Sequence, residues 1–443
     1  MKKRLLHIGL ITFGLSALAF SGTFYLKDFQ SLGNDFNPPI PASTSLRLSN
    51  AFSESPDFNE FDARMESFIK KWNIAGASVA IAKDERLVFA KAYGYADREL
   101  KIQTEPYNLF RVASVSKLVT AVGIMKLVEQ HRINLDSKVF GESGILNDSI
   151  FLNYIDPRVE LITVKQLLEH SAGWTSRWGD HMFMPTVISA KLNKPLPVGV
   201  DDIIEFALMH RLHFQPNSQS GYSNLGYAVL GKVIEKVSGD DYESYIRKEV
   251  LFPLGIFDMR LGGSLLTERF ENEVKYYEPD STVLVEDYRG TGQMVSRTYG
   301  GNDIHSLGAA GGWIASATDL MKLMLSIDGN TKIKDLLSPE SVDLMVTPES
   351  PLKSPLGWRR VKETAWIRTG TLASVSALMV HQMDGISYVV LLNSGTWKGA
   401  DFTVEVERQL NLFIPTIAHW PTYNLFDLNS QPMVPMQPLL SSR

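Results

Sequence analysis

Three segments of the chain have the Ser-x-x-Lys spacing that lets a serine hydroxyl meet a lysine amine. Residues three apart lie on one face of a helix, so the amine can take the hydroxyl proton and activate the serine as a nucleophile. The pairs are Ser67 with Lys70, Ser114 with Lys117, and Ser350 with Lys353. Such a pair predicts covalent acyl transfer wherever the lysine can lose its charge.

Ser114 and Lys117 are the pair whose surroundings favour this chemistry. They open the stretch 118–125, which is apolar nearly all round and is expected to form a buried helix. Burial and the positive end of the helix both disfavour a charged ammonium, so we expect the pKa of Lys117 to fall. Ser67 instead lies on the polar face of a helix, and Pro351 disfavours helical geometry in the third pair. The alternative interpretation of Ser114 and Lys117 is a helix N-cap followed by a lysine that reaches solvent.

Two later segments carry side chains that can assist such a serine. Gly221-Tyr222-Ser223-Asn224 precedes a predicted helix, and an extended backbone there points Tyr222 and Asn224 the same way. A phenol beside Lys117 shifts toward phenolate and relays protons, and Asn224 can orient Lys117 or a substrate amide. The segment 366–371 (WIRTGT) places a cation, small hydroxyls and a glycine on a strand, along which a substrate can lie. Taken singly, each segment is more typical of a structural element than of a site, a helix cap in the first and a strand end in the second.

Together, the order and spacing of the three segments resemble the serine β-lactamase and penicillin-binding-protein superfamily. Its sets are S-x-x-K, then S-D-N or Y-x-N, then K-T-G or a variant. The Y-x-N form is similar to that of class C β-lactamases, D,D-carboxypeptidases and related esterases and D-aminopeptidases. Further family-like segments are ITVKQLLEHSAGW (162–174), FPLGI (252–256) and AAGGWIASATDL (309–320). The resemblance covers residues 58–413.

The resemblance implies a role for each matching residue. Ser114 would be the nucleophile that forms an acyl-enzyme, and Lys117 and Tyr222 would share the work of general base. Asn224 would position the substrate amide, and the backbone N–H groups of Ser114 and Thr371 would form the oxyanion hole. The strand residues implied in substrate binding are Arg368, Thr369, Gly370 and Thr371.

Arg368 departs from the family pattern, in which Lys or His usually stands at this position. Arginine keeps the positive charge but does not exchange a proton, and its planar fork matches a carboxylate with two parallel hydrogen bonds. We therefore expect Arg368 to bind a substrate carboxylate. The alternative is that Arg368 only supplies positive potential.

Apolar periodicity predicts the elements that hold these residues in place. The stretches 61–72 and 402–413 each carry an apolar stripe and indicate helices near the two ends of the body. Strands are predicted in two hairpins, over 77–82 with 86–95 and over 375–382 with 386–393. Capped helices begin at Thr163 and Ser316 between them. This pattern predicts an α/β fold in which an antiparallel sheet is flanked by helices, with a mostly helical second lobe and a cleft between the lobes.

The composition is that of a globular protein and excludes several other classes. The chain has 443 residues, of which 44% are hydrophobic and 21% charged, and its formal net charge is −5. These values exclude a disordered or polytopic membrane protein, and the mild charge without a basic stripe speaks against nucleic acid as a partner. The sequence contains no cysteine, which excludes disulfides and cysteine-ligated zinc. Neither a cofactor nor a metal is expected.

The two ends of the chain are predicted to lie outside the folded domain, residues 58–413. Residues 1–26 begin with Lys2-Lys3-Arg4 and continue as an apolar stretch, typical of a signal peptide but also long enough for a single membrane anchor. Residues 27–57 indicate a linker, and residues 414–443 a proline-rich tail. The body is therefore expected in the periplasm or cell envelope, either released or anchored to the inner membrane.

The sequence thus predicts an exported serine hydrolase of the class C β-lactamase-related type, cleaving an amide or ester through an acyl-enzyme on Ser114. Its partner would be a small-molecule or peptide substrate, cell-wall peptide included. The choice among peptide, ester and lactam stays open, as does the oligomeric state. The alternative is a non-catalytic envelope sensor that binds penicillin or peptidoglycan.

Overall fold

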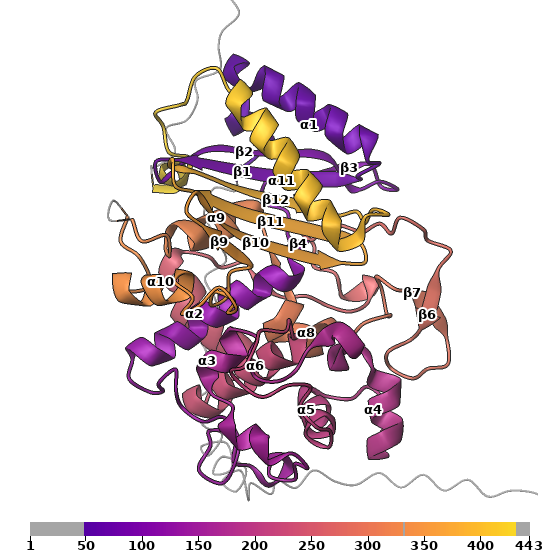
Figure 1. Ribbon diagram of the computed structural model, residues 1–443. Helices are drawn as coiled ribbons and strands as arrows, with labels where there is room; N and C mark the ends of the chain where they lie inside the picture. Colours follow the sequence, from indigo (N-terminus) through magenta and orange to yellow (C-terminus); the bar gives the residue numbers. More distant parts are fainter. Residues whose placement is uncertain (1–47, 331–332, 431–443) are drawn as a thin grey trace, which may run out of the picture. The chain divides into compact units, whose positions relative to one another are not determined.

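Seven strands form one antiparallel sheet between two layers of helices in the computed structural model, which describes residues 48–330 and 333–430 (Figure 1). The strand order is β3-β2-β1-β12-β11-β10-β9, and each pairing along it is antiparallel. The strands are β1 Gly76–Lys83, β2 Arg86–Asp97, β3 Ile102–Gln103, β9 Arg360–Lys362, β10 Ala365–Leu372, β11 Val375–Gln382 and β12 Ile386–Leu392. The predicted antiparallel sheet is therefore confirmed.

The two predicted hairpins, β1–β2 and β11–β12, meet at the centre of this sheet. Ala77 of β1 stands opposite Leu392 of β12, and the antiparallel register continues to Lys83 opposite Ile386. The first and last long strands of the body thus pair with each other. Because this central pair is buried on both faces, its strands are almost continuously apolar rather than alternating.

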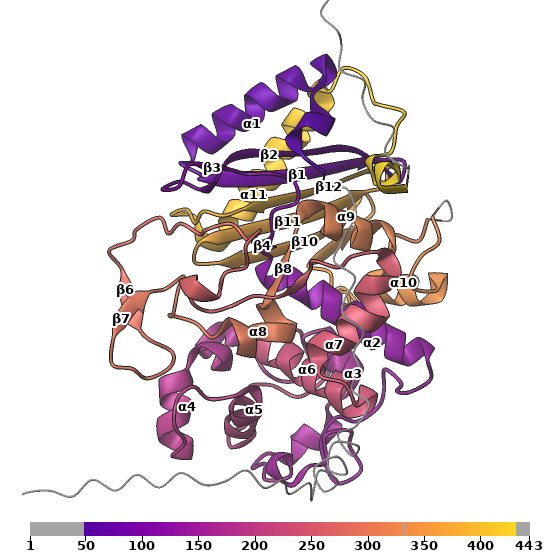
Figure 2. The same cartoon turned by 180° about the vertical axis from the view of Figure 1, so that it is seen from behind.

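Each face of the sheet is covered by different helices (Figures 1 and 2). Helices α1 (Asn59–Lys71) and α11 (Phe402–Phe413) lie on one face, and α2 (Ser116–Glu129) and α9 (Ala317–Leu325) contribute to the other. Successive strand residues point to opposite faces, so Val79 packs in the cluster with α1 and α11, whereas Ala80 packs in the cluster with α2 and α9. The predicted apolar stripes of the two terminal helices are confirmed as the buried faces of α1 and α11.

The second lobe is mostly helical, as predicted (Figure 2). The capping box at Thr163 forms at the start of α3, although α3 ends at Leu168, and Ser316 caps α9 by accepting a hydrogen bond from Asp319 N. The remaining helices are α3 Val164–Leu168, α4 Pro185–Leu192, α5 Val200–Leu208, α6 Asn224–Ser238, α7 Tyr242–Ile246, α8 Ile304–Gly311 and α10 Pro339–Val346. Two small sheets join β4 Phe110–Arg111, β8 Trp313–Ala315 and β5 Arg260–Leu261, and β6 Leu284–Glu286 with β7 Met294–Ser296.

The folded body is longer at both ends than the predicted 58–413. Residues 48–57, expected in the linker, hold two short 3-10 turns, and the Ser53 hydroxyl exchanges hydrogen bonds with the backbone of Ala90 at 2.9 Å. Residues 414–430, expected in the tail, bury Ile414, Ile417 and Leu425. The sequence did not predict that these two segments belong to the folded body, because they are rich in polar residues and their few apolar residues follow no regular period.

The predicted signal or anchor segment, residues 1–26, lies outside the described residues, as do 27–47 and 431–443. Among helices of the described part of the chain, none has the length and apolar character that crossing a bilayer requires.

Candidate active site

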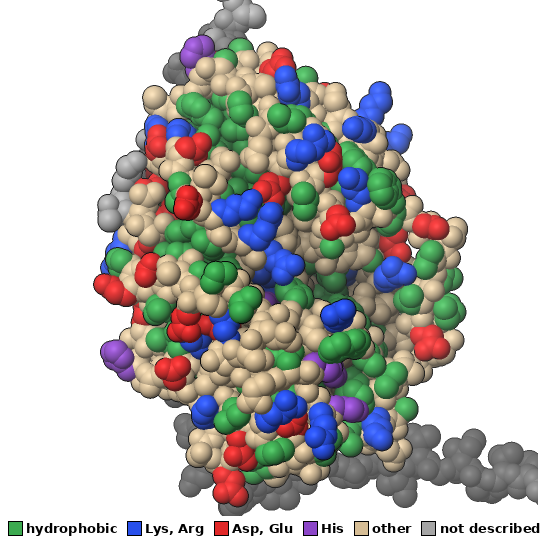
Figure 3. All heavy atoms as spheres, in the orientation of Figure 1, with side chains coloured by type: hydrophobic (Ala, Val, Ile, Leu, Met, Phe, Trp, Pro, Cys, Tyr) green, Lys and Arg blue, Asp and Glu red, His purple; other side chains and the backbone are tan. Residues whose placement is uncertain are grey.

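A cavity of about 630 Å³ opens between β10 and the helical lobe. Its walls come from β10, the turn before α2, the end of α8, the residues that precede α6, and the start of α11. The face shown in Figure 3 carries basic side chains near its middle, and three arginines line the cavity. The predicted cleft between the lobes is therefore confirmed.

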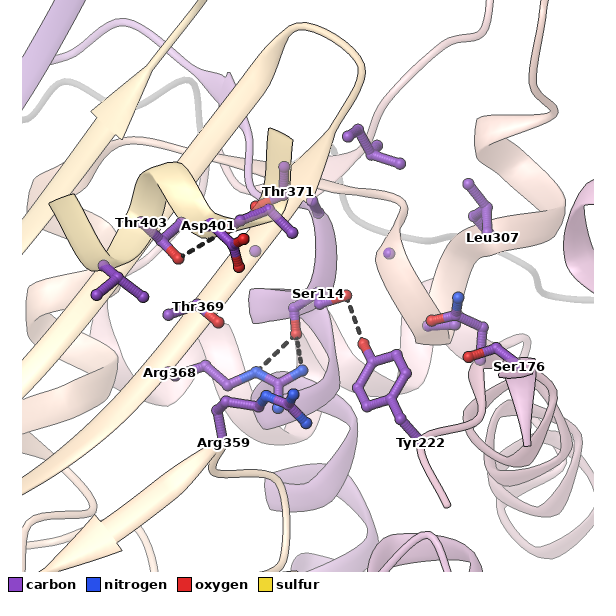
Figure 4. A pocket seen from close by; sticks show the side chains of 18 of the residues that line it. Ser114, Ser176, Tyr222, Leu307, Arg359, Arg368, Thr369, Thr371, Asp401 and Thr403 are labelled. Atoms are coloured by element: carbon purple, nitrogen blue, oxygen red, sulfur yellow. Dashed lines mark hydrogen bonds between the residues drawn. The ribbon is translucent and has the colours of Figure 1, made fainter. Parts of the chain in front are cut away.

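Ser114 lies in this cavity on a short 3-10 turn, Ala113–Val115, that leads directly into α2 (Figure 4). Strand β10 passes so close to the turn that a Cβ on Gly370 would stand 2.2 Å from Val112 O and 2.9 Å from Ser114 N. A side chain at position 370 therefore cannot be accommodated without moving the backbone. Glycine at this point lets β10 and the serine form one continuous wall.

The hydroxyl of Ser114 contacts both predicted proton acceptors. Ser114 Oγ lies 2.7 Å from Tyr222 OH, and Lys117 Nζ donates to Ser114 Oγ at 3.3 Å. Lys117 is fully buried and also donates to Ala310 O at 2.5 Å. The alternative of a serine N-cap with a solvent-reaching lysine is therefore wrong, because the serine side chain caps no helix and the lysine points inward.

The pKa values of these groups shift in the directions that proton transfer needs. Burial lowers the pKa of Lys117 from its ordinary value, the charge of Arg368 adds to this effect, and Tyr222 and Asp180 oppose it. Burial alone would raise the pKa of Tyr222. The positive charges of Lys117 and Arg368 and the hydrogen bond to Ser114 outweigh burial and lower the Tyr222 pKa to about 8. The two groups titrate as a coupled pair across a single serine hydroxyl.

Asn224 orients Lys117 from the first turn of α6. Its Oδ1 accepts a hydrogen bond from Lys117 Nζ at 2.6 Å, while its Nδ2 donates to Asp180 Oδ2 at 2.6 Å. The backbone of Ser223 is extended as expected, with φ −141° and ψ 122°, and Ser223 also caps α6 by accepting a hydrogen bond from Gly226 N, so the helix begins at Asn224. Asn224 and Tyr222 reach the same cavity. Asp180, which completes this chain of contacts, was not predicted because it lies in a loop without periodicity.

The guanidinium group of Arg368 is already occupied by contacts within the protein. Its side chain is only 1% exposed, and both its Nε, at 2.8 Å, and its Nη2 donate to the backbone carbonyl oxygen of Ser114. The prediction that this fork binds a substrate carboxylate is therefore wrong. The two donors that would hold the carboxylate instead fix the turn that carries the serine. The charge of Arg368 still acts on Tyr222, as its pKa indicates.

The other predicted strand residues, Thr369, Gly370 and Thr371, all line the cavity, and their roles in substrate binding stay predictions. Arg359 and Asp401 also line the cavity and were not predicted. The sequence signal for Arg359 was the adjacent pair of arginines just before a strand.

The other two Ser-x-x-Lys pairs lie away from this cavity. Ser67 and Lys70 are exposed on α1, as expected of solvated residues. In the third pair, Lys353 lies 3.6 Å from the Glu169 carboxylate and donates to Asn217 O at 3.0 Å. Its ammonium therefore serves ion pairing and loop contacts.

Comparison with known proteins places this fold in the superfamily of serine β-lactamases and penicillin-binding proteins. The model of the Beta-lactamase family matches residues 61–410, and the chain therefore belongs to that family.

Three relatives illustrate the range of the similarity. "Protein flp" of Staphylococcus aureus (strain NCTC 8325 / PS 47) is 30% identical over 195 residues, which is 44% of this chain and 36% of that protein, so the match spans about a third of this relative. The octameric penicillin-binding protein homologue from Pyrococcus abyssi is 26% identical with a TM-score of 0.61, covering 80% of this chain and 77% of that one. The D-amino acid amidase from Ochrobactrum anthropi SV3 is 20% identical with a TM-score of 0.63, covering 82% and 99%, and this likeness concerns the fold alone.

Proposed function

We propose that the protein is an exported serine hydrolase that cleaves an amide or an ester through an acyl-enzyme on Ser114. The observation that carries this proposal is the contact of Ser114 Oγ with Tyr222 OH at 2.7 Å and with Lys117 Nζ at 3.3 Å. A serine hydroxyl between a phenol and an amine whose pKa values are both lowered has two neighbours able to accept its proton.

Acylation begins when the Ser114 proton passes to the pair of Tyr222 and Lys117. Oγ attacks the carbonyl carbon of the substrate, and the negative charge that develops on the carbonyl oxygen is stabilised by the N–H groups of Ser114 and Thr371. One such donor contributes about 10²–10³ in rate. Tyr222 then protonates the leaving nitrogen or oxygen as its bond to carbon breaks.

Deacylation repeats these steps with water. Tyr222 and Lys117 accept a proton from a water molecule, which attacks the acyl carbon and releases Ser114. The hydrogen bonds from Lys117 to Asn224 Oδ1 and Ala310 O keep the amine within reach of the serine in both halves of the reaction.

Labelling of the nucleophile tests the catalytic part of the proposal. A fluorophosphonate or a fluorescent penicillin is expected to modify the peptide that contains Ser114, and Ser114→Ala is expected to abolish labelling. Ser67→Ala and Ser350→Ala serve as matched controls and are expected to label like the parent protein. An adduct on Ser67 or Ser350 contradicts the proposal.

Turnover separates a hydrolase from a non-catalytic envelope sensor. A hydrolase releases nitrophenol from a nitrophenyl ester continuously, whereas a sensor gives one equivalent per protein and stops. The contacts of Ser114 Oγ with both Lys117 and Tyr222 support the hydrolase, because two proton acceptors beside the serine serve deacylation as well as acylation.

Export is motivated by Lys2-Lys3-Arg4 followed by an apolar stretch. We expect cell fractionation to find the protein in the periplasm or with the envelope. Recovery of the full-length chain from the soluble cytoplasmic fraction contradicts this part of the proposal.

A further inference from the structure

Three arginines line the cavity, and two of them are already engaged. Arg360 pairs with Glu407 of α11 at 2.5 Å, and Arg368 donates to the backbone carbonyl of the turn that carries the serine. The side chain of Arg359 is exposed and forms no hydrogen bond or ion pair with any described residue. Its Cζ lies 5.3 Å from the centroid of the Tyr222 ring. An exposed guanidinium at the mouth of a cleft has its N–H donors available for an anion.

A free carboxylate lines the cavity on the other side of the serine. Asp401 ends the 3-10 turn Gly399–Asp401 ahead of α11, is exposed, and its side chain caps no helix. Within the described residues this carboxylate belongs to no ion pair. Figure 4 shows Asp401 near Thr371, with Ser114 between Asp401 and Arg359.

The proposed reaction indicates which part of the substrate faces Arg359 and which part faces Asp401. Tyr222, which lies under Arg359, protonates the leaving group, so the leaving group occupies the Arg359 side of the cavity. The acyl part is bonded to the same carbonyl carbon and points away from the leaving group, so it occupies the side of the cavity that Asp401 and Thr371 line. A substrate in this cleft meets positive charge at its leaving group and negative charge at its acyl part.

Resting on the proposed function, we infer that the protein cleaves short peptides in which both termini are free. Arg359 binds the carboxylate of the leaving amino acid, and Asp401 binds the terminal ammonium of the acyl part. Ser114 Oγ bonds to the peptide carbonyl carbon, the C–N bond breaks as Tyr222 protonates the nitrogen, and water then releases the acyl part as an acid. A cavity of about 630 Å³ is of the size that encloses a small ligand, which suits a short peptide.

Blocked peptides test the two charges separately. The probes are dialanine of D and of L configuration, each with free termini, with the amine acetylated, with the carboxylate amidated, or with both blocked. Acetylating the amine or amidating the carboxylate is expected to lower kcat/KM of the parent protein about 10-fold in each case. This is the lower end of the range for losing one charge-assisted hydrogen bond, because the side chains of Arg359 and Asp401 are both exposed and screened by salt. Raising the ionic strength is expected to weaken both preferences.

Two variants are expected to lose one preference each. Arg359→Ala no longer distinguishes the carboxylate from the carboxamide but still prefers the free amine, and Asp401→Asn shows the reverse. Arg360→Ala and Glu405→Gln are matched controls, since Arg360 is paired with Glu407 and Glu405 with Arg408. Both controls are expected to keep the two ratios. Each ratio compares two peptides on one variant, so a difference in the fraction of folded protein cancels.

The outcomes distinguish this inference from the proposed function. Equal cleavage of free and blocked peptides by the parent protein overturns the inference, as does an Arg359→Ala ratio that matches the parent. Labelling of Ser114 with ester turnover, but without cleavage of any peptide of the series, also overturns it and leaves the serine hydrolase standing. Absence of Ser114 labelling overturns the proposed function itself.

Discussion

The carboxylate of Asp180 accepts a hydrogen bond from the Asn224 side-chain amide at 2.6 Å, and the oxygen of that amide accepts from Lys117 Nζ, also at 2.6 Å. Asp180 Oδ1 also accepts from Met182 N at 3.1 Å, which fixes the carboxylate at the start of a 3-10 turn. Only the side-chain amide of Asn224 therefore separates the negative charge of Asp180 from the buried amine of Lys117.

Asp180→Asn is expected to shift the acid limb of the pH profile of kcat/KM toward lower pH. The Asp180 charge raises the Lys117 pKa, so without it Lys117 loses its proton at a lower pH and the neutral amine forms earlier. The other charges that face Lys117 are those of Arg368 and of Tyr222 when ionised. The imidazole of His170, whose pKa burial lowers well below its usual value, stays neutral.

The pair Asp180→Asn and Asp180→Ala separates charge from position. The asparagine keeps an acceptor for Asn224, so kcat at the optimum is expected to change little, whereas alanine frees the amide and lowers kcat. An acid limb that does not move in Asp180→Asn contradicts an electrostatic role for Asp180.

Tyr222→Phe is expected to reduce kcat/KM for a nitrophenyl ester about 10²–10⁴-fold, the range of general acid–base catalysis. The phenol oxygen, 2.7 Å from Ser114 Oγ, is removed while the ring that packs against Lys117 remains. Steady-state kinetics across pH 6–10 also tests whether the limb near the Tyr222 pKa of about 8 disappears. A loss smaller than about tenfold leaves Lys117 as the main base.

Gly370→Ala is expected to abolish labelling of Ser114. The new Cβ would stand 2.2 Å from Val112 O, so β10 and the serine turn must separate. Gly226→Ala in α6 is a matched control, because its Cβ finds no atom closer than 3.7 Å and alanine favours a helix by roughly 0.5–1 kcal/mol. Thermal unfolding of both variants shows whether the loss of labelling is local. Normal labelling of Gly370→Ala would falsify the described approach of the strand.

Arg368→Met is expected to lower kcat/KM by the same factor for neutral esters and for carboxylated substrates. The fork holds the Ser114 carbonyl, so its loss disturbs the nucleophile whatever the substrate carries. The charge of Arg368 also lowers the Tyr222 pKa, so an upward shift of the limb near pH 8 is expected in this variant. A loss confined to carboxylated substrates restores the carboxylate-binding role that the sequence predicts.

A buried group of acids outside the cavity predicts how stability depends on pH. Burial, and then the charges of Asp335 and Glu85, raise the Asp328 pKa to about 7, and burial raises the Asp335 pKa to about 6. Burial lowers the pKa of His381 to about 4, so this ring, 4.0 Å from Asp328, supplies no positive charge above that pH. The unfolded chain releases these protons near pH 3.9. The contribution to stability is therefore full below about pH 4, falls as pH rises through 6 and 7, and is lost above 7.

Asp328→Asn is expected to be more stable than the parent at pH 8 by roughly 1–3 kcal/mol, with the difference shrinking toward pH 4. Urea unfolding at the two pH values measures it. Destabilisation at pH 8 means that the ionised carboxylate makes a favourable contact.

Local signals account for the parts of the structure that the sequence predicted. The hairpins follow from apolar runs around short turns, and Lys117 is buried because its helix is apolar on every side. Arg368 was misassigned because its neighbour, the Ser114 carbonyl, is 254 residues away in sequence and comes close only where Gly370 lets β10 approach. Asp180 and Asp401 lie in loops and short turns, where no period relates a residue to the surface that it faces.

Because β1 pairs with β12, the central sheet can close only late in the folding of this chain. Gly76 N donates to the side chain of Asn393, 317 positions further on, so the middle of the sheet stays open until the residues around Asn393 have been synthesised. Contacts between such distant positions slow folding, because a long loop must close before they form. The helical lobe, whose contacts are closer in sequence, can assemble first. The nascent chain then carries the β1–β2 hairpin with one edge of the apolar strand β1 unpaired, and this edge needs protection until β12 emerges.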